Sequence, residues 1–309
     1  MRKTMYLFAF LALCGMAATI TACKKSRMNK ETTSEADNST AESMFDDVGK
    51  TTDQVADDEN LDGSQKTGAP AEYLFASTTC TPVITINPPA WDTATGQWNP
   101  TFPKTLTIDF GTAGCLGADG KTRKGKIIVT TTGKYRDAGT VITTTLDNFY
   151  VSDNGTDFYH IEGTRTVTNQ GNYTFSVVVS GAKITHPDGT FLTWESTRTR
   201  TWIEGMNTGF LSLKSDSTCC MWWTGILDDV YSVTGSGSGV NRDGIAFTVT
   251  VTEALRVQFC GYKVEVTDGV VEIQPDGLKK RTVDFGDGTC DNSATVSVGN
   301  KTKTIQLHG

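Results

Sequence analysis

Regular alternation of polar and apolar residues runs through most of this chain, and it restricts the fold more than any other feature. Residues 126–132, 141–151, 173–184 and 191–203 all alternate with a period of two, as half-buried strands do. Turn sequences separate them, namely Asp-Asn-Gly at 153–155 and Pro-Asp-Gly at 187–189 and 275–277. The pattern predicts an all-β fold, an antiparallel meander that forms a sandwich or a curved sheet.

A membrane barrel fits this pattern less well, because the strands of a barrel present apolar side chains to lipid. In the segment "ESTRTRTW" one alternating face carries Ser196, Arg198 and Arg200, and the other carries threonines. Neither face is apolar, so we expect neither to contact lipid.

Two cysteine-bearing units repeat near 80–115 and 260–290. The stretch "TIDFGTAGC" ends at Cys115 and "TVDFGDGTC" ends at Cys290, and a second cysteine opens an alternating strand upstream of each, at Cys80 and at Cys260. Two antiparallel neighbouring strands would bring the outer ends of each unit together. This predicts disulfides Cys80–Cys115 and Cys260–Cys290.

The rival arrangement pairs equivalent cysteines, such as Cys115 with Cys290, across a pseudo-symmetric interface. In the predicted arrangement Cys219 and Cys220 remain, either bonded to each other or as thiols. A second repeat lies between the units and predicts hairpins with turns at 169–172 and 241–244.

The N-terminus reads as a signal peptide over residues 1–22, with Arg2 and Lys3 before an apolar run at 5–20 that is too short to span a membrane. Residues 20–23, Ile-Thr-Ala-Cys, resemble the lipobox of bacterial lipoproteins. This resemblance implies cleavage before Cys23 and a diacylglycerol on its sulfur. The alternative is an ordinary secretory signal, with Cys23 as an incidental thiol.

Residues 23–72 are polar and acidic, and such a composition predicts a disordered, flexible tether, which as a coil would span about 40 Å. A short helix is the alternative, since Ser39 and Glu42 have capping-box spacing and Phe45, Val48 and Val55 could share one face. The β-rich part, 73–309, is long enough for one domain or for two close-packed ones.

The net charge of the 309-residue chain is −7, which disfavours nucleic acid as a partner. Export to an oxidising compartment agrees with the predicted disulfides.

Residues with catalytic potential are few, and we predict a non-enzymatic protein without a cofactor or a metal. The three histidines, His160, His186 and His308, have no metal-ligand spacing, and the last two are expected to be exposed. Glu195 and Glu204 are the carboxylate pair considered for a hydrolase, but in one strand they would lie about 30 Å apart. Oxygen-rich loops at 153–157 and 287–292 could bind calcium, although turn formation explains them equally.

Tryptophans in predicted loops suggest a glycan-binding or adhesin function, because exposed indole rings stack on sugars. Trp91 and Trp98 lie inside the first cysteine unit, and Trp222 and Trp223 follow the paired cysteines in "CCMWW". In the simpler interpretation, these aromatic side chains cover the end of the core.

The lipobox, the acidic segment, the "DFG…C" units and "TRTRTWIEG" together resemble uncharacterised β-rich lipoproteins of Bacteroidota, a group without an established activity. The resemblance implies a protein anchored to the outer membrane by covalent lipid. The partner we predict is a glycan, from the tryptophan-bearing loops, or an envelope protein. Lys24 and Lys25 follow Cys23 where surface-exposed members often carry acidic residues, so the periplasmic face and the cell surface both stay open. Thr93 and Ser217 lie in triplets that resemble the O-glycosylation sequon of that phylum.

Overall fold

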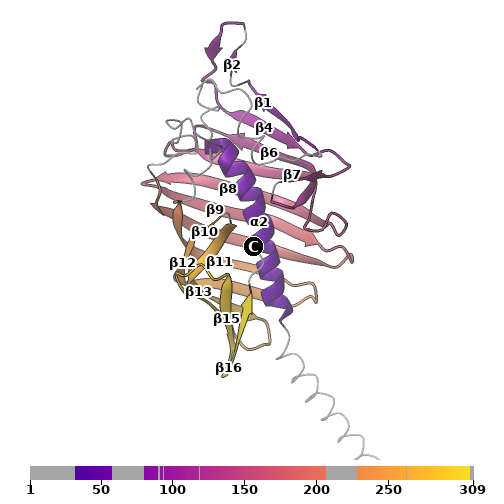
Figure 1. Ribbon diagram of the computed structural model, residues 1–309, viewed down its shortest axis with the longest axis vertical. Helices are drawn as coiled ribbons and strands as arrows, with labels where there is room; N and C mark the ends of the chain where they lie inside the picture. The colour runs from indigo at the N-terminus through magenta and orange to yellow at the C-terminus, as the bar shows by residue number, and fades with distance from the viewer. Residues whose placement is uncertain are drawn as a thin grey trace, which may run out of the picture.

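A single antiparallel sheet of 14 strands dominates the computed structural model, which describes residues 32–57, 80–89, 91–92, 94–117, 119–206, 228–261 and 263–306. Figure 1 shows the sheet with helix α2 crossing many of its strands on one side. The strands follow one another almost in chain order, so the predicted all-β antiparallel meander is confirmed. It forms one open sheet and not the two packed sheets of a sandwich.

The sheet runs in the order β1-β4-β6-β7-β8-β9-β10-β11-β12-β13-β14-β15-β16, with β5 paired to β6, and β2 and β3 form a separate hairpin. The elements are α2 (Thr33–Asp57), β1 (Val83–Asn87), β2 (Trp91–Asp92), β3 (Gln97–Trp98), β4 (Lys104–Asp109), β5 (Cys115–Leu116), β6 (Thr122–Thr131), β7 (Val141–Ser152), β8 (Tyr159–Gly171), β9 (Thr174–Thr185), β10 (Phe191–Glu204), β11 (Val230–Val240), β12 (Ala246–Cys260), β13 (Lys263–Pro275), β14 (Arg281–Asp287), β15 (Ser293–Val298) and β16 (Lys301–Gln306).

Each predicted turn lies between two neighbouring strands. The turns at 153–155, 187–189 and 275–277 join β7 to β8, β9 to β10 and β13 to β14. Both predicted hairpins are present, β8–β9 and β11–β12. In the first, Asn172 and Tyr173 have φ angles of 49° and 57°, the left-handed conformation that a tight hairpin turn requires.

Both predicted disulfides are present. Cys80–Cys115 and Cys260–Cys290 each have a Cα–Cα distance of 5.5 Å, and they link the ends of the pairs β1–β4 and β13–β14. The two units also match in detail, because Asp109 and Asp284 each accept a 2.9 Å hydrogen bond from the backbone N–H of the glycine two residues later. The cross-paired alternative is therefore wrong.

Helix α2 is the main departure from the sequence-based expectation. Residues 33–57 were expected within a flexible tether, with a short helix as the alternative, and the structure has the helix. It is 25 residues long, begins at Thr33 and not at Ser39, and buries Phe45 and Val48 on one face as the alternative expected. The side chains of Ala41, Met44, Phe45 and Val48 are buried, as i, i+3, i+4 and i+7 positions on one helix face are when they pack on a sheet. Among the described residues no helix is long and apolar enough to cross a bilayer.

Candidate functional site: the sheet face under helix α2

A row of carboxylate–arginine pairs joins α2 to the sheet, and we call it the α2 ion-pair row. Each acidic residue of the row meets an arginine from a different strand or turn, across β14, the β11–β12 turn, β10 and β6. The pairs are Glu35–Arg281, Asp37–Arg242, Glu42–Arg198 and Asp47–Arg123. The helix is thus connected to strands far apart in the sheet and in the sequence.

The pair nearest the C-terminal end of α2 is the most deeply buried. The side chains of Arg123 and Asp47 are 4% and 5% exposed, and the guanidinium donates from Nε and Nη2 to the two oxygens of Asp47 at 3.0 and 2.5 Å. Asp119 also accepts from Arg123, and Lys121 lies 3.4 Å from Asp47. Burial disfavours the charged guanidinium, but Asp47 and Asp119 outweigh it and raise the pKa of Arg123.

At the other end of α2, Asp37 forms the centre of a second buried cluster. Its two oxygens accept from the Nε and the backbone N–H of Arg242, both at 2.7 Å. His186 Nε2 lies 3.8 Å from Asp37, and Tyr159 contacts the imidazole edge to face. Burial and then the charge of Arg242 lower the pKa of His186.

The expected exposure of His186 is therefore wrong, since the residue is only 6% exposed. His186 does lie in the chain reversal after β9, as the sequence indicates, but the N-terminal part of α2 packs against it. The sequence did not indicate a helix over this chain reversal, so His186 was expected to be exposed.

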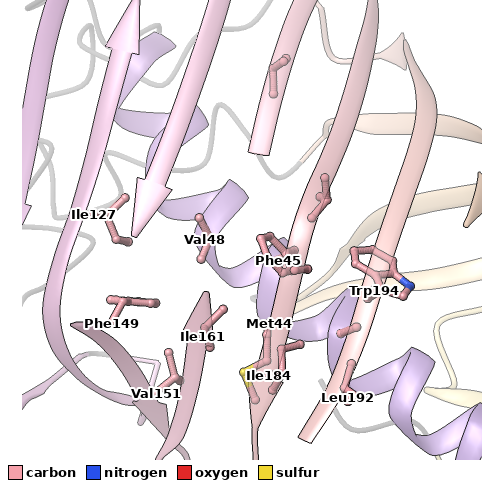
Figure 2. Close-up of a cluster of buried hydrophobic side chains, with 14 of the residues drawn as sticks. Met44, Phe45, Val48, Ile127, Phe149, Val151, Ile161, Ile184, Leu192 and Trp194 are labelled. Atoms are coloured by element: carbon pink, nitrogen blue, oxygen red, sulfur yellow. The ribbon is translucent and has the colours of Figure 1, made fainter. Parts of the chain in front are cut away.

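Between the charged clusters, apolar contacts hold the helix against the sheet. Figure 2 shows Phe45 on the side of Trp194, Met44 beside Ile184 of β9, and Val48 among the labelled residues of β6–β8. The rings of Phe45 and Trp194 are stacked at 5.9 Å, and the Trp194 indole N–H donates to Asn38 Oδ1 at 3.0 Å. One tryptophan therefore makes both an apolar and a polar contact with the helix.

An alternating stack of arginine and aromatic side chains lies on β9–β11 and the loop after β6. Arg200 lies 5.4 Å from the Phe175 ring and 4.9 Å from the Tyr231 ring, and Tyr231 stacks on Trp202 at 5.6 Å. Arg136 covers the Trp202 ring at 4.8 Å. Cation–π contacts of this kind stabilise the packing of neighbouring strands.

Many of the site residues expected from the sequence lie outside the described residues. These are Cys23, Thr93, Ser217, Trp222 and Trp223, together with Cys219 and Cys220. Trp91 and Trp98 are described at the level of the backbone, where the register of the β2–β3 hairpin places them directly opposite each other. The two tryptophans that the sequence indicated in one loop thus lie in a short hairpin, at opposite positions of its two strands.

The carboxylates considered for catalysis or metal binding have structural partners. Glu195 and Glu204 both lie in β10, where Glu195 accepts from the Gly181 backbone N–H and Glu204 pairs with Arg256. In the oxygen-rich loops, turn-forming hydrogen bonds involve Asn154 and Asp287. Glu265 lies close to Cys260 and Cys290, but their disulfide leaves no thiolate to act as a ligand.

An open groove of about 580 Å³ lies across β10–β13 and contains the carboxylates Glu195 and Asp276. Asp276 directly follows β13, and β10 and β13 are three strand spacings apart, about 14 Å.

Comparison with known proteins gives no match, since no family model, no curated protein and no solved structure is significantly similar to this chain.

Proposed function

We propose that this protein is a non-enzymatic lipoprotein of the cell envelope, held at the outer membrane by lipid on Cys23, with a structural or binding role. The lipobox-like sequence Ile-Thr-Ala-Cys at residues 20–23, which follows a signal-peptide pattern, is the observation that supports this best. Thr33, the first residue of α2, is ten positions after Cys23, so a lipid on Cys23 would lie within about 35 Å of the helix. Because α2 is paired with arginines of the sheet, the lipid would hold the whole sheet close to the membrane.

Metabolic labelling with a palmitate analogue tests the anchor. We expect the wild type to be labelled and Cys23→Ala to lose the label. Cys14→Ala is the matched control, because this second cysteine lies in the apolar run of the signal peptide and its removal should leave labelling intact. Equal labelling of Cys23→Ala and wild type would refute the proposal.

The side of the membrane needs a separate experiment. Protease treatment of intact cells, compared with cells whose outer membrane has been permeabilised, distinguishes the cell surface from the periplasmic face. Digestion only after permeabilisation would assign the protein to the periplasmic face. Digestion in intact cells would assign it to the surface.

Glycan binding is the second candidate function, and the pairing of Trp91 with Trp98 favours it. Directly opposite positions of an antiparallel pair lie on the same face, an arrangement that suits stacking on sugar rings. We expect saturable quenching of tryptophan fluorescence by one class of polysaccharide. Trp91→Ala with Trp98→Ala should abolish it, while Trp222→Ala with Trp223→Ala tests the other loop. A glycan array and titrations without any saturable response would exclude this candidate.

A further inference from the structure

The two disulfides differ in how easily a thiol from solution can reach their sulfur atoms. In the first unit Cys115 is only 3% exposed and belongs to the hydrophobic core, so one end of Cys80–Cys115 is buried. In the second unit Cys290 is exposed and Cys260 is only partly buried. The Gln258 side-chain amide donates to Cys290 Sγ at 3.6 Å. This contact holds the Cys290 sulfur at an accessible position.

A carboxylate lies beside the second disulfide. Glu265 is directly opposite Gln258 in the β12–β13 ladder, and one of its carboxylate oxygens lies within 4.8 Å of the sulfurs of both Cys260 and Cys290. Its Oε2 atom is buried and has no hydrogen-bond partner among the described residues, which is uncommon for a buried acceptor. Within the same residues, no carboxylate or imidazole approaches both sulfurs of the first disulfide in this way.

The neighbouring charged side chains have partners of their own. On β12, Arg256 pairs with Glu204 of β10 at 2.7 Å. In the loop that carries the exposed cysteine, Asp287 accepts from a threonine hydroxyl at 2.7 Å, and Asp291 accepts from a serine backbone N–H at 3.0 Å. Glu265 is therefore the group that is placed to take up and return a proton at this disulfide.

We propose that Cys260–Cys290 is a thiol-exchange site, at which a thiol from outside the chain becomes bonded to Cys290. The incoming thiol gives its proton to the Glu265 carboxylate, and its sulfur bonds to Cys290 Sγ. The Cys260–Cys290 bond breaks, the Cys260 sulfur leaves with the electron pair, and Glu265 returns the proton to it. One S–S bond forms for the one that breaks, so the incoming thiol is oxidised to a mixed disulfide while Cys260 is reduced to a thiol.

The arrangement of the site favours attack at Cys290 with help from the carboxylate. Cys290 is the more exposed sulfur, and access decides which sulfur of a disulfide is attacked. Because the thiolate is the reactive form, a base beside the disulfide can generate it from a neutral thiol, and one water molecule can bridge the distance from Glu265. The reaction is stoichiometric, so it adds a covalent attachment site to the proposed binding role and does not depend on lipid on Cys23.

Glutathione and a peptide with a single cysteine are the two probes of this site. The full-length protein in detergent is incubated with each probe at pH 7, and peptide mapping then locates the disulfides. We expect Cys260–Cys290 to open at least about tenfold faster than Cys80–Cys115, with the probe attached to Cys290. A faster reaction with glutathione would indicate a small thiol as the ligand, and a faster reaction with the peptide would indicate a protein thiol. Opening no faster than that of Cys80–Cys115, or attachment to Cys260, would overturn the proposal.

Replacing Glu265 tests the proton transfer. Glu265→Gln keeps the size of the side chain and should slow opening of the second disulfide at least about tenfold at pH 7, with Cys80–Cys115 unaffected. From pH 7 to pH 6 the rate should fall about tenfold in this variant, which depends on thiolate in solution, and less than about threefold in the wild type. Glu272→Gln is the control, because Glu272 lies on the same strand but pairs with Lys280. A wild-type rate and pH profile in Glu265→Gln would overturn the proposal.

Discussion

Replacing Asp47 with alanine is expected to lower the free energy of unfolding by about 3 kcal/mol, because it leaves Arg123 buried without its main partner. The two side chains are 4% and 5% exposed and share two hydrogen bonds at 3.0 and 2.5 Å. Loss of one partner of a buried ion pair costs about 3–5 kcal/mol, and Asp119 compensates part of the charge that remains. We therefore expect a value at the lower end of that range.

Urea denaturation measures this value, provided that the dependence of the unfolding free energy on urea concentration does not change. Glu272→Ala is the control, because it breaks the more exposed pair with Lys280 and should cost less than about 1 kcal/mol. The double variant Asp47→Leu with Arg123→Met should recover most of the lost stability, since it removes both buried charges. If Asp47→Ala were no more destabilising than the control, the docking of α2 described above would be refuted.

Three further predictions concern other contacts. Phe45→Ala should cost about 3–5 kcal/mol in the same assay and alter the fluorescence of Trp194, whose ring it contacts. Burial and the charge of Arg242 lower the pKa of His186, so the unfolded state binds a proton more readily than the folded state. The melting temperature should therefore fall as the pH drops below about 6.5, the ordinary pKa of histidine. The fall should be smaller in His186→Gln. Cys260→Ser should cost about 3–4 kcal/mol by opening a loop with a sequence separation of 30 residues, and an unchanged unfolding midpoint would contradict the assigned disulfide.

The sheet could be predicted because its determinants are local. Alternation, turn residues and the spacing of matched cysteines are all visible within short windows, and the strands then pair with their neighbours in sequence. The two disulfides could be predicted for the same reason, since each joins the two ends of one strand–loop–strand unit. Long-range information entered only through the match between the two cysteine units, which supported a disulfide within each unit.

A helix around Phe45 and Val48 was a stated alternative, but the docking of α2 on the sheet could not be predicted in the same way, because its partners are remote. Asp47 meets a residue 76 positions away and Glu35 meets one 246 positions away. In isolation the segment has too few apolar residues to remain folded, and its acidic side chains would favour solvent. The sequence also did not indicate a partner for the arginines of the sheet, since Arg198 lies on a face of β10 that carries Ser196 and Arg200 and is not apolar.

A signal for the docked helix was nevertheless present in β10. Trp194, Ser196 and Arg198 alternate on one face, so the large aromatic residue and the arginine had to share an environment. A tryptophan side chain is seldom fully exposed to solvent, so another element was expected to pack on Trp194. A helix with acidic residues could do so and pair with Arg198 as well. Composition alone does not show that the arginines on this face of the sheet pair with acidic residues of a helix far away in the sequence.

Docking of α2 also changes the expected position of the protein relative to the membrane. A flexible tether over residues 23–72 would let the β domain move about 40 Å from a lipid on Cys23. With α2 bound to the sheet, a lipid on Cys23 would be only ten positions along the chain from Thr33, the first residue of the helix, and a coil of that length has a dimension of about 17 Å. The proposed anchor and the α2 ion-pair row are therefore linked, because any change that releases the helix also lengthens the tether.

In a lipidated protein, Asp47→Ala should increase the distance between a fluorophore on the sheet and a dye in the bilayer. Glu272→Ala should leave that distance unchanged.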